Sequence, residues 1–226
     1  MLQALYTDRI EAGRKLAHAL VTRGLRHIDL VLGLARGGVP VANEVARSLG
    51  AELEVMIVRK LGVPGHPELA MGALAQGGVR VLNDRVVEAL AIDRATIEEA
   101  ALREELELNR RARYLRGTLE PVSVENRVVA IVDDGIATGS TMKAAVRAVR
   151  RGKPRELMVA VPVAPHSVVP ELAGEVDHLV IDSFPEPFFA VGTWYYVFRE
   201  VPDEEVRRVL VRFRAERKRR ALEVRP

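Results

Sequence analysis

The 226-residue chain contains no cysteine, which excludes disulfide bonds, thiolate chemistry and zinc sites built on cysteine. It also lacks any apolar run near the roughly 20 residues that a membrane-spanning helix needs, and its N-terminal residues do not follow a signal-peptide pattern. These absences predict a cytoplasmic protein with no membrane partner. The basic C-terminal segment lacks the repeated interleaving of aromatic and basic residues that is typical of nucleic-acid surfaces, so nucleic acid is not expected as a partner.

Charged residues are plentiful but nearly balanced, with a formal net charge of +3. Most of the basic residues are arginines, which suit both phosphate recognition and surface ion pairs. Abundant Arg and Glu with few Asn and Gln is typical of a thermophilic source, although a GC-rich genome favours several of the same residues. The five histidines show no metal-ligand spacing, so we expect no metal site built on them.

Short apolar runs alternate with amphipathic segments along most of the chain, a pattern typical of strand–helix–strand units with parallel pairing. Strands are predicted over residues 29–34, 53–58, 128–132, 157–161 and 178–181. Helices are predicted over residues 7–23, 40–49, 93–116, 142–149 and 167–173, and from 203 onward. The predicted fold class is α/β, a doubly wound, mostly parallel sheet with helices on both faces. At this length we expect a single domain, residues 1–226.

Two adjacent carboxylates, Asp133 and Asp134, directly follow the apolar run 128–132. A turn of small and hydroxylated residues comes next and leads into a predicted helix; it contains Ala137, Thr138, Gly139, Ser140 and Thr141. Glycine lets backbone approach an anion closely, amides at a helix N-terminus attract negative charge, and hydroxyls add donors. The stretch therefore predicts a phosphate site beside an acid pair suited to hydroxyl groups or a metal ion. An ordinary capped strand–helix connection would explain the turn but not the two acids.

Residues 33–38, with the sequence GLARGG, form a second turn between a predicted strand and a predicted helix. Backbone amides and the guanidinium of Arg36 could bind an anion there. A simple glycine-rich connection is an equally good interpretation of this turn on its own.

The apolar strand, the two acids and the turn ATGST together resemble the phosphoribosyl diphosphate (PRPP) motif of the type I phosphoribosyltransferases. The resemblance covers residues 29–163 well, and extends loosely to a small hood formed by residues 1–28 and 177–226. A Walker A loop is a poor match, because no lysine precedes Ser140, and the G-x-G-x-x-G of a dinucleotide site is absent.

The resemblance implies transfer of the 5-phosphoribosyl group of PRPP to a nitrogenous base, with release of diphosphate and with Mg²⁺ as cofactor. In this family residues 137–141 would hold the 5′-phosphate. Asp133 and Asp134 would contact the ribose hydroxyls, directly or through Mg²⁺, and stabilise positive charge on the sugar. Diphosphate binding would fall to Ala35, Arg36, Gly37, Arg59 and Lys60. A cis peptide bond between Ala35 and Arg36 is also expected from the resemblance.

Residues 59–78 occupy the place of a flexible loop in this family, and their glycines and prolines suit a lid that closes over the site. The alternative is a solvent loop with two ordinary surface bases. Two residues of this segment, His66 and Glu68, could contact the leaving group or the substrate, but nothing in the sequence requires it.

Residues 188–195 resemble the hood of hypoxanthine-type members, whose aromatic rings could stack on a base or could equally belong to the core. Two departures leave the acceptor base open: residues 159–163 contain no lysine, and Ala137 stands where those enzymes carry an acid. We expect a homodimer. The alternative function is a non-catalytic regulatory protein that kept the PRPP pocket but lost turnover.

Overall fold

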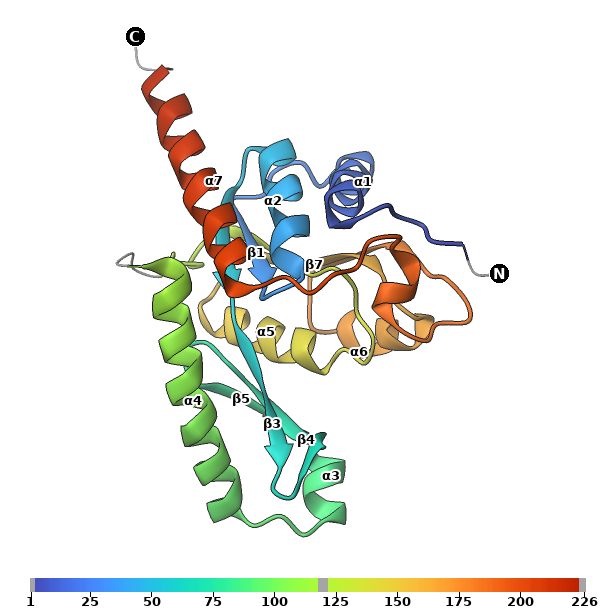
Figure 1. Ribbon diagram of the computed structural model, residues 1–226, viewed down its shortest axis with the longest axis vertical. Coiled ribbons are helices and arrows are strands. Elements are labelled where there is room, and N and C mark those ends of the chain that lie inside the picture. The colour runs from blue at the N-terminus through green and yellow to red at the C-terminus, as the bar shows by residue number, and fades with distance from the viewer. Residues whose placement is uncertain (1–2, 118–121, 224–226) are drawn as a thin grey trace.

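The computed structural model describes residues 3–117 and 122–223. Its centre is a five-stranded sheet in the order β2-β1-β6-β7-β8, and every neighbouring pair in it is parallel. The strands are β1 (Leu30–Leu34), β2 (Glu52–Met56), β6 (Val128–Val132), β7 (Glu156–Val163) and β8 (His178–Ser183). The predicted parallel α/β sheet is therefore confirmed, and Figure 1 shows helices on both of its faces.

The side chains of β1 show how the sheet divides the core. Val31 belongs to the apolar cluster that contains Leu16 and Val41, whereas Leu32 belongs to the cluster that contains Met142. Successive side chains of a strand point to opposite faces, so both faces are covered and all five residues of β1 are buried. The first cluster lies under α1 (Arg9–Thr22) and α2 (Gly38–Leu49); the second lies under α5 (Ser140–Arg151) and α6 (Val169–Leu172), which the short helix η1 (His166–Val168) precedes.

A separate antiparallel sheet is formed by β3 (Val58–Val63), β4 (His66–Ala75) and β5 (Val79–Leu82). The predicted strand 53–58 is thus too long, because the chain leaves the main sheet after β2 and starts β3 at Val58. The sequence also predicts that residues 70–75 and 79–82 pair as a hairpin across residues 76–78, and the pairing of Ala75 with Val79 confirms it. Most of the predicted flexible loop 59–78 consists of paired strands in this structure, so its closure over the site stays a prediction.

Two helices accompany the small sheet, α3 (Asp84–Ala89) and the long α4 (Arg94–Arg116), and together they extend away from the main sheet in Figure 1. The charge density of residues 94–116 predicts a solvated face on α4. Its outer face is indeed charged, but Ile97, Ala101 and Leu108 are buried in the core. The same cluster includes Leu61 and Leu74 of the small sheet, so α4 joins both sheets.

One buried carboxylate ties three elements together. Glu54 of β2 is 1% exposed, and its side chain lies 3.3 Å from Arg116 of α4 and 3.0 Å from Arg214 of α7 (Asp203–Glu223). Val55 also donates its backbone N–H to Glu54 at 2.7 Å. A buried carboxylate without partners would destabilise the fold. The two arginines therefore compensate the charge of Glu54.

The N-terminal segment lies against residues 194–195 beside β7. The backbone amides of Leu5 and Tyr6 both donate to the carbonyl of Trp194, at 3.0 and 3.1 Å, at the end of the short helix η2 (Val191–Trp194). Tyr6, Trp194 and Tyr195 are buried there in a small cluster of their own. From this point the chain continues into α7, whose far end extends beyond the rest of the molecule in Figure 1.

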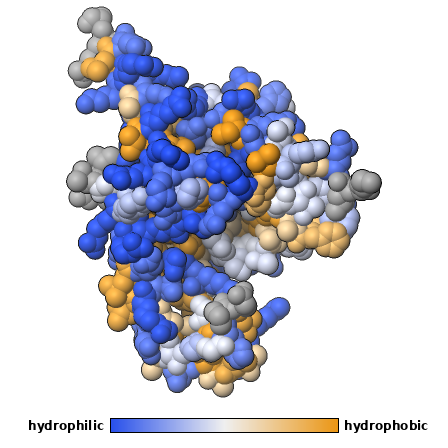
Figure 2. Space-filling model, viewed as in Figure 1, coloured by the Kyte–Doolittle hydropathy of each residue, from blue (hydrophilic) through white to orange (hydrophobic). Residues whose placement is uncertain are grey.

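Hydrophilic residues cover most of the face shown in Figure 2. None of the helices within the described ranges has the length and apolar character that crossing a membrane would require.

Candidate functional site

The strand order places a topological switch point between β1 and β6. The chain runs from β1 outward to β2 on one side, and from β6 outward to β7 and β8 on the other. In open α/β sheets the crevice at such a point, beyond the carboxyl ends of the strands, is where ligands bind. The residues that follow β1 and β6 are the two turns that the sequence singles out, so the fold brings them together.

The two turns approach so closely that only glycine fits. A Cβ atom on Gly37 would lie 2.0 Å from Oδ2 of Asp134 and 3.3 Å from Nε of Arg9. A Cβ atom on Gly38 would lie 2.8 Å from Oδ1 of Asp133. These positions therefore need glycine for close packing against the acid pair. The peptide bond between Ala35 and Arg36 is cis, as expected.

Arg9 of α1 forms the main contact to the acid pair. Its Nε donates to Oδ2 of Asp134 at 2.8 Å, and the two side chains are 11% and 13% exposed. Its terminal nitrogen donates to the carbonyl of Arg199 at 2.9 Å, and its guanidinium carbon lies 3.9 Å from the centre of the Phe198 ring. An ion pair with so little exposure is weakly screened, so Arg9 holds Asp134 firmly in place.

The two acids differ in their surroundings. Burial raises the pKa of Asp133 well above its usual range, and the charge of neighbouring Asp134 raises it further. Burial also raises the pKa of Asp134, but Arg9 opposes that rise through its charge and hydrogen bond. Asp133 accepts a hydrogen bond from the backbone N–H of Asp134 at 2.9 Å, and within the described residues it forms no ion pair. The chain therefore compensates the charge of Asp133 less than it compensates the charge of Asp134.

Tyr195 supports the acid pair from the hood. Its hydroxyl donates to the backbone carbonyl of Asp134 at 2.5 Å, and burial raises the pKa of this hydroxyl. The ring packs 5.4 Å from that of Tyr6, whose hydroxyl donates to Asp182 at 2.7 Å. The backbone of the acid pair is thus attached to the place where the N-terminal segment lies against Tyr195.

The turn after the acid pair is open to solvent. Gly139 has φ +78°, a left-handed conformation that favours glycine, and it directly precedes α5, which has no side-chain cap. Thr138, Ser140 and Thr141 are exposed, and across the described ranges their hydroxyls form no hydrogen bond. Amides at the start of α5 and three unengaged hydroxyls therefore surround a space suited to an anion.

The predicted diphosphate residues are divided by the fold. Ala35, Arg36 and Gly37 lie beside the acid pair, and the Arg36 guanidinium pairs with Glu200. Arg59 lies on β3 and pairs with Glu104 of α4 at 2.6 Å, while Lys60 is exposed on the same strand. The structure thus joins the first three to the site and turns Arg59 toward α4, so a role for Arg59 and Lys60 stays a prediction.

The other residues predicted to contact the substrate differ in their surroundings. His66 is exposed at the start of β4, and the side chain of Glu68 lies outside the described residues. Of the hood aromatics, Trp194 and Tyr195 are 4% and 5% exposed and belong to the core, whereas Phe189 is 74% exposed. Only exposed rings such as Phe189 are free to meet a base, so the stacking and core interpretations each fit part of the segment.

Mg²⁺ would need oxygen ligands from the substrate as well as from the chain. Among the described residues no three His, Cys, Asp or Glu side chains are grouped as a metal site. Mg²⁺ usually binds one or two carboxylates together with substrate phosphates and waters. Arg9 engages Oδ2 of Asp134, so Asp133 is the carboxylate better placed for such a shared site. The residues fit Mg²⁺ on those terms.

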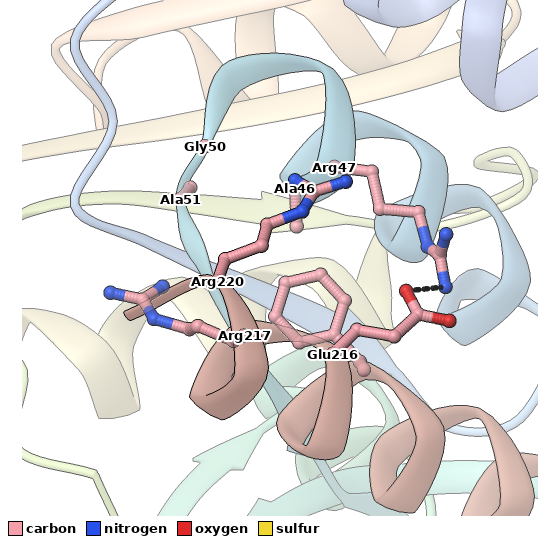
Figure 3. A pocket seen from close by; sticks show the side chains of 8 residues that line it. Ala46, Arg47, Gly50, Ala51, Glu216, Arg217 and Arg220 are labelled. Carbon is pink, nitrogen blue, oxygen red and sulfur yellow. Dashed lines mark ion pairs between the residues drawn. The ribbon is translucent and has the colours of Figure 1, made fainter. Parts of the chain in front are cut away.

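A hollow of about 390 Å³ lies between α2 and α7, lined by Ala46, Arg47, Gly50, Ala51, Phe213, Glu216, Arg217 and Arg220. Figure 3 shows Arg47 reaching Glu216, and the nitrogen–oxygen distance of this pair is 2.5 Å. The hollow adjoins the C-terminal end of α2, whereas the Gly37–Gly38 turn lies at its N-terminal end. It is therefore separate from the two turns at the switch point.

Sequence reasoning did not identify Arg9, Tyr195 or Glu200 as residues of this site. Arg9 is one arginine among many in a predicted amphipathic helix, and Glu200 lies in an irregular segment. Neither follows a motif, and their proximity depends on how the chain ends fold back. Tyr195 belongs to the aromatic segment that the sequence does single out, although as a ring near a base.

The chain is similar to known proteins over most of its length. The sequence model of the phosphoribosyl transferase domain matches residues 4–195. A Mycobacterium tuberculosis protein whose name assigns it to the phosphoribosyl transferases is 46% identical over 202 residues, 89% of this chain and 45% of its own. The chain thus spans about half the length of the curated relatives it matches. The crystal structure of TT1426 from Thermus thermophilus superposes with a TM-score of 0.79 at 43% identity, covering 92% of this chain and 98% of that one.

The residues matched by the family model include both turns at the switch point, the acid pair and Arg9. The chain belongs to the phosphoribosyl transferase domain family.

Proposed function

We propose that the protein transfers the 5-phosphoribosyl group of PRPP to a ring nitrogen of a nitrogenous base and releases diphosphate. The observation that supports this best is the packing of the Gly37–Gly38 turn against Asp133 and Asp134, with the unengaged hydroxyl turn directly beyond them. The switch point thereby offers an anion-binding turn on each side of an acid pair. PRPP has the matching pattern, with a phosphate at one end, a diphosphate at the other and ribose hydroxyls between.

In this arrangement the amides at the start of α5 and the hydroxyls of Thr138, Ser140 and Thr141 hold the 5′-phosphate. Asp133 accepts hydrogen bonds from the ribose hydroxyls, and Asp134 stays fixed by Arg9. On the other side Arg36 and the backbone near Gly37 hold the diphosphate. The site fixes both ends of the substrate and leaves the anomeric carbon between them exposed to the incoming base.

The reaction breaks the bond between the anomeric carbon and the diphosphate oxygen and forms a bond from that carbon to the base nitrogen. Positive charge develops on the sugar ring as the leaving group departs, and the carboxylate of Asp133 stabilises it. The electron pair of the broken bond leaves with the diphosphate, beside Arg36. The nitrogen that attacks gives up its proton to solvent. When bound, Mg²⁺ would neutralise charge on the diphosphate, held by its oxygens and by Asp133.

Release of diphosphate is the measurement that tests this proposal. The protein would be incubated with PRPP and Mg²⁺ and with each of a panel of purine and pyrimidine bases. We expect release with at least one base, and its loss in the Asp133→Asn variant. PRPP binding without release for any base would favour the non-catalytic regulatory alternative instead. No binding of PRPP would overturn both functions.

A further inference from the structure

A short segment from the C-terminal part of the chain crosses the candidate site. Residues 198–200 connect the hood to α7; they contact the first turn through Arg36 and reach the acid pair only through Arg9. Arg9, which is bound to Asp134, donates to the carbonyl of Arg199 at 2.9 Å and stacks over the ring of Phe198. The next residue, Glu200, pairs through its carboxylate with the guanidinium of Arg36. We call residues 198–200 the strap.

The strap is anchored on one side and exposed on the other. Arg9 is 11% exposed and bound to Asp134, and its two further contacts hold Phe198 and Arg199. The pair at the other end is open to solvent, since the Arg36 side chain is 38% exposed and that of Glu200 is 74% exposed. Exposed pairs contribute little and exchange readily with other ions. The anchored end can therefore stay in place while the exposed end opens.

Arg36 offers the same donors to a carboxylate and to a phosphate. A guanidinium binds either group through two parallel N–H donors. Glu200 is the acid with which Arg36 pairs among the residues that the structure describes. A diphosphate group that reaches this turn would therefore meet an arginine whose charge is already partly neutralised by the chain itself.

We propose that Glu200 is an internal counter-ion for Arg36, and that a diphosphate-bearing ligand must displace it to bind. This inference rests on the proposed function, which assigns Arg36 to the diphosphate. Glu200 then has two effects. It keeps the exposed arginine from binding other anions weakly in the absence of substrate, and it lowers the affinity for diphosphate and PRPP by competition. Product release benefits from the same competition, because Glu200 returns to Arg36 as diphosphate leaves.

The test compares two matched variants, Glu200→Gln and Glu205→Gln. Glu205 is the control because it makes a partly exposed pair with Arg199 of the strap, at 2.7 Å, and its replacement changes the net charge equally. Inorganic diphosphate and PRPP would be titrated calorimetrically into each protein. We expect Glu200→Gln to bind both ligands about two- to fivefold more tightly, the range that loss of one exposed pair spans, and Glu205→Gln to match the unchanged protein.

A third protein separates the possible outcomes. In the double variant Glu200→Gln with Arg36→Met, the gain in diphosphate affinity should disappear, because the arginine that Glu200 releases is absent. The counter-ion proposal would be overturned if Glu200→Gln bound diphosphate no more tightly than the unchanged protein. It would also be overturned if Glu205→Gln gained as much affinity as Glu200→Gln. If no protein binds PRPP, the proposed function fails. Tighter binding of inorganic diphosphate to Glu200→Gln alone, lost with Arg36, would still support the counter-ion in that case.

Discussion

The acid pair and the hydroxyl turn both follow β6, yet their polar groups differ in whether the protein supplies them with hydrogen-bond partners. Asp134 is held by Arg9 through its side chain and by Tyr195 through its backbone carbonyl. Thr138 and Ser140, a few residues later, are exposed, and in the described ranges their hydroxyls have no hydrogen-bond partner. One part of the site is fixed by the protein, and the other has polar groups that only solvent or a ligand can satisfy.

This difference indicates which substitutions affect folding and which affect only binding. Changes at the acid pair or at the glycines packed against it should alter both stability and ligand affinity. Changes in the hydroxyl turn should alter affinity alone. Each variant below would therefore be measured in two ways, by chemical unfolding and by calorimetric titration with PRPP.

Gly37→Ala should have the largest effect. The added methyl group would lie 2.0 Å from a carboxylate oxygen of Asp134, so the two turns must separate. We expect PRPP affinity to fall at least about a hundredfold and the free energy of unfolding to fall by about 1–3 kcal/mol. Gly174→Ala is the matched control, because a Cβ atom there meets nothing within 4 Å. Unchanged affinity in Gly37→Ala would contradict the close packing of the two turns.

The two acids should respond differently to replacement by asparagine. Asp134→Asn leaves Arg9 largely buried without its carboxylate, so the free energy of unfolding should fall by about 2 kcal/mol. Asp133→Asn removes a buried carboxyl whose ionised form no cation of the described chain pairs with, so at neutral pH the free energy of unfolding should rise by about 1 kcal/mol. Both should reduce turnover about a hundredfold or more. Equal losses of stability would show that Arg9 does not distinguish the two acids.

The pH dependence of stability follows from the raised pKa of Asp133. The folded protein binds this proton more tightly than the unfolded chain does, so the stability that Asp133 contributes is present at acidic pH. It is lost as the pH rises through the raised pKa. The gain in the free energy of unfolding of Asp133→Asn should therefore grow between acidic and neutral pH. A gain that shrinks over that interval would contradict the assignment.

Thr138→Val should have the smallest effect on folding. The hydroxyl it removes is exposed and has no partner in the described structure, so the free energy of unfolding should change by no more than about 0.5 kcal/mol. The affinity for PRPP should nevertheless fall about tenfold, because one hydrogen bond to a charged phosphate is lost. A variant with normal affinity would exclude Thr138 from the phosphate site.

The fold and both turns could be predicted from the sequence because each depends on residues close together in the chain. The buried strand 128–132 is an unbroken apolar run, and Asp133 and Asp134 follow it directly. Strands, turns and helix ends of this kind can be recognised from the hydrophobic periodicity and the residue types of a short stretch of sequence.

The contacts that complete the site could not be predicted in this way. Arg9 and Asp134 are 125 residues apart, and Arg36 and Glu200 are 164 apart. Each pair depends on how the chain ends fold over the sheet, and a single arginine or glutamate in a charged helix or loop carries no local signal. The small sheet was predicted only in part. The hairpin of β4 and β5 was expected, but the glycines and prolines of residues 59–78 suggested a loop, and β3 is stabilised by packing against α4.

Calorimetric titration of PRPP into the unchanged protein with Mg²⁺ present tests the central claim most directly. Binding at the switch point predicts saturation at one PRPP per chain, and weaker binding of ribose 5-phosphate, which lacks the diphosphate that Arg36 would hold. A protein that takes up neither ligand would contradict the assignment of these turns to a phosphoribosyl site.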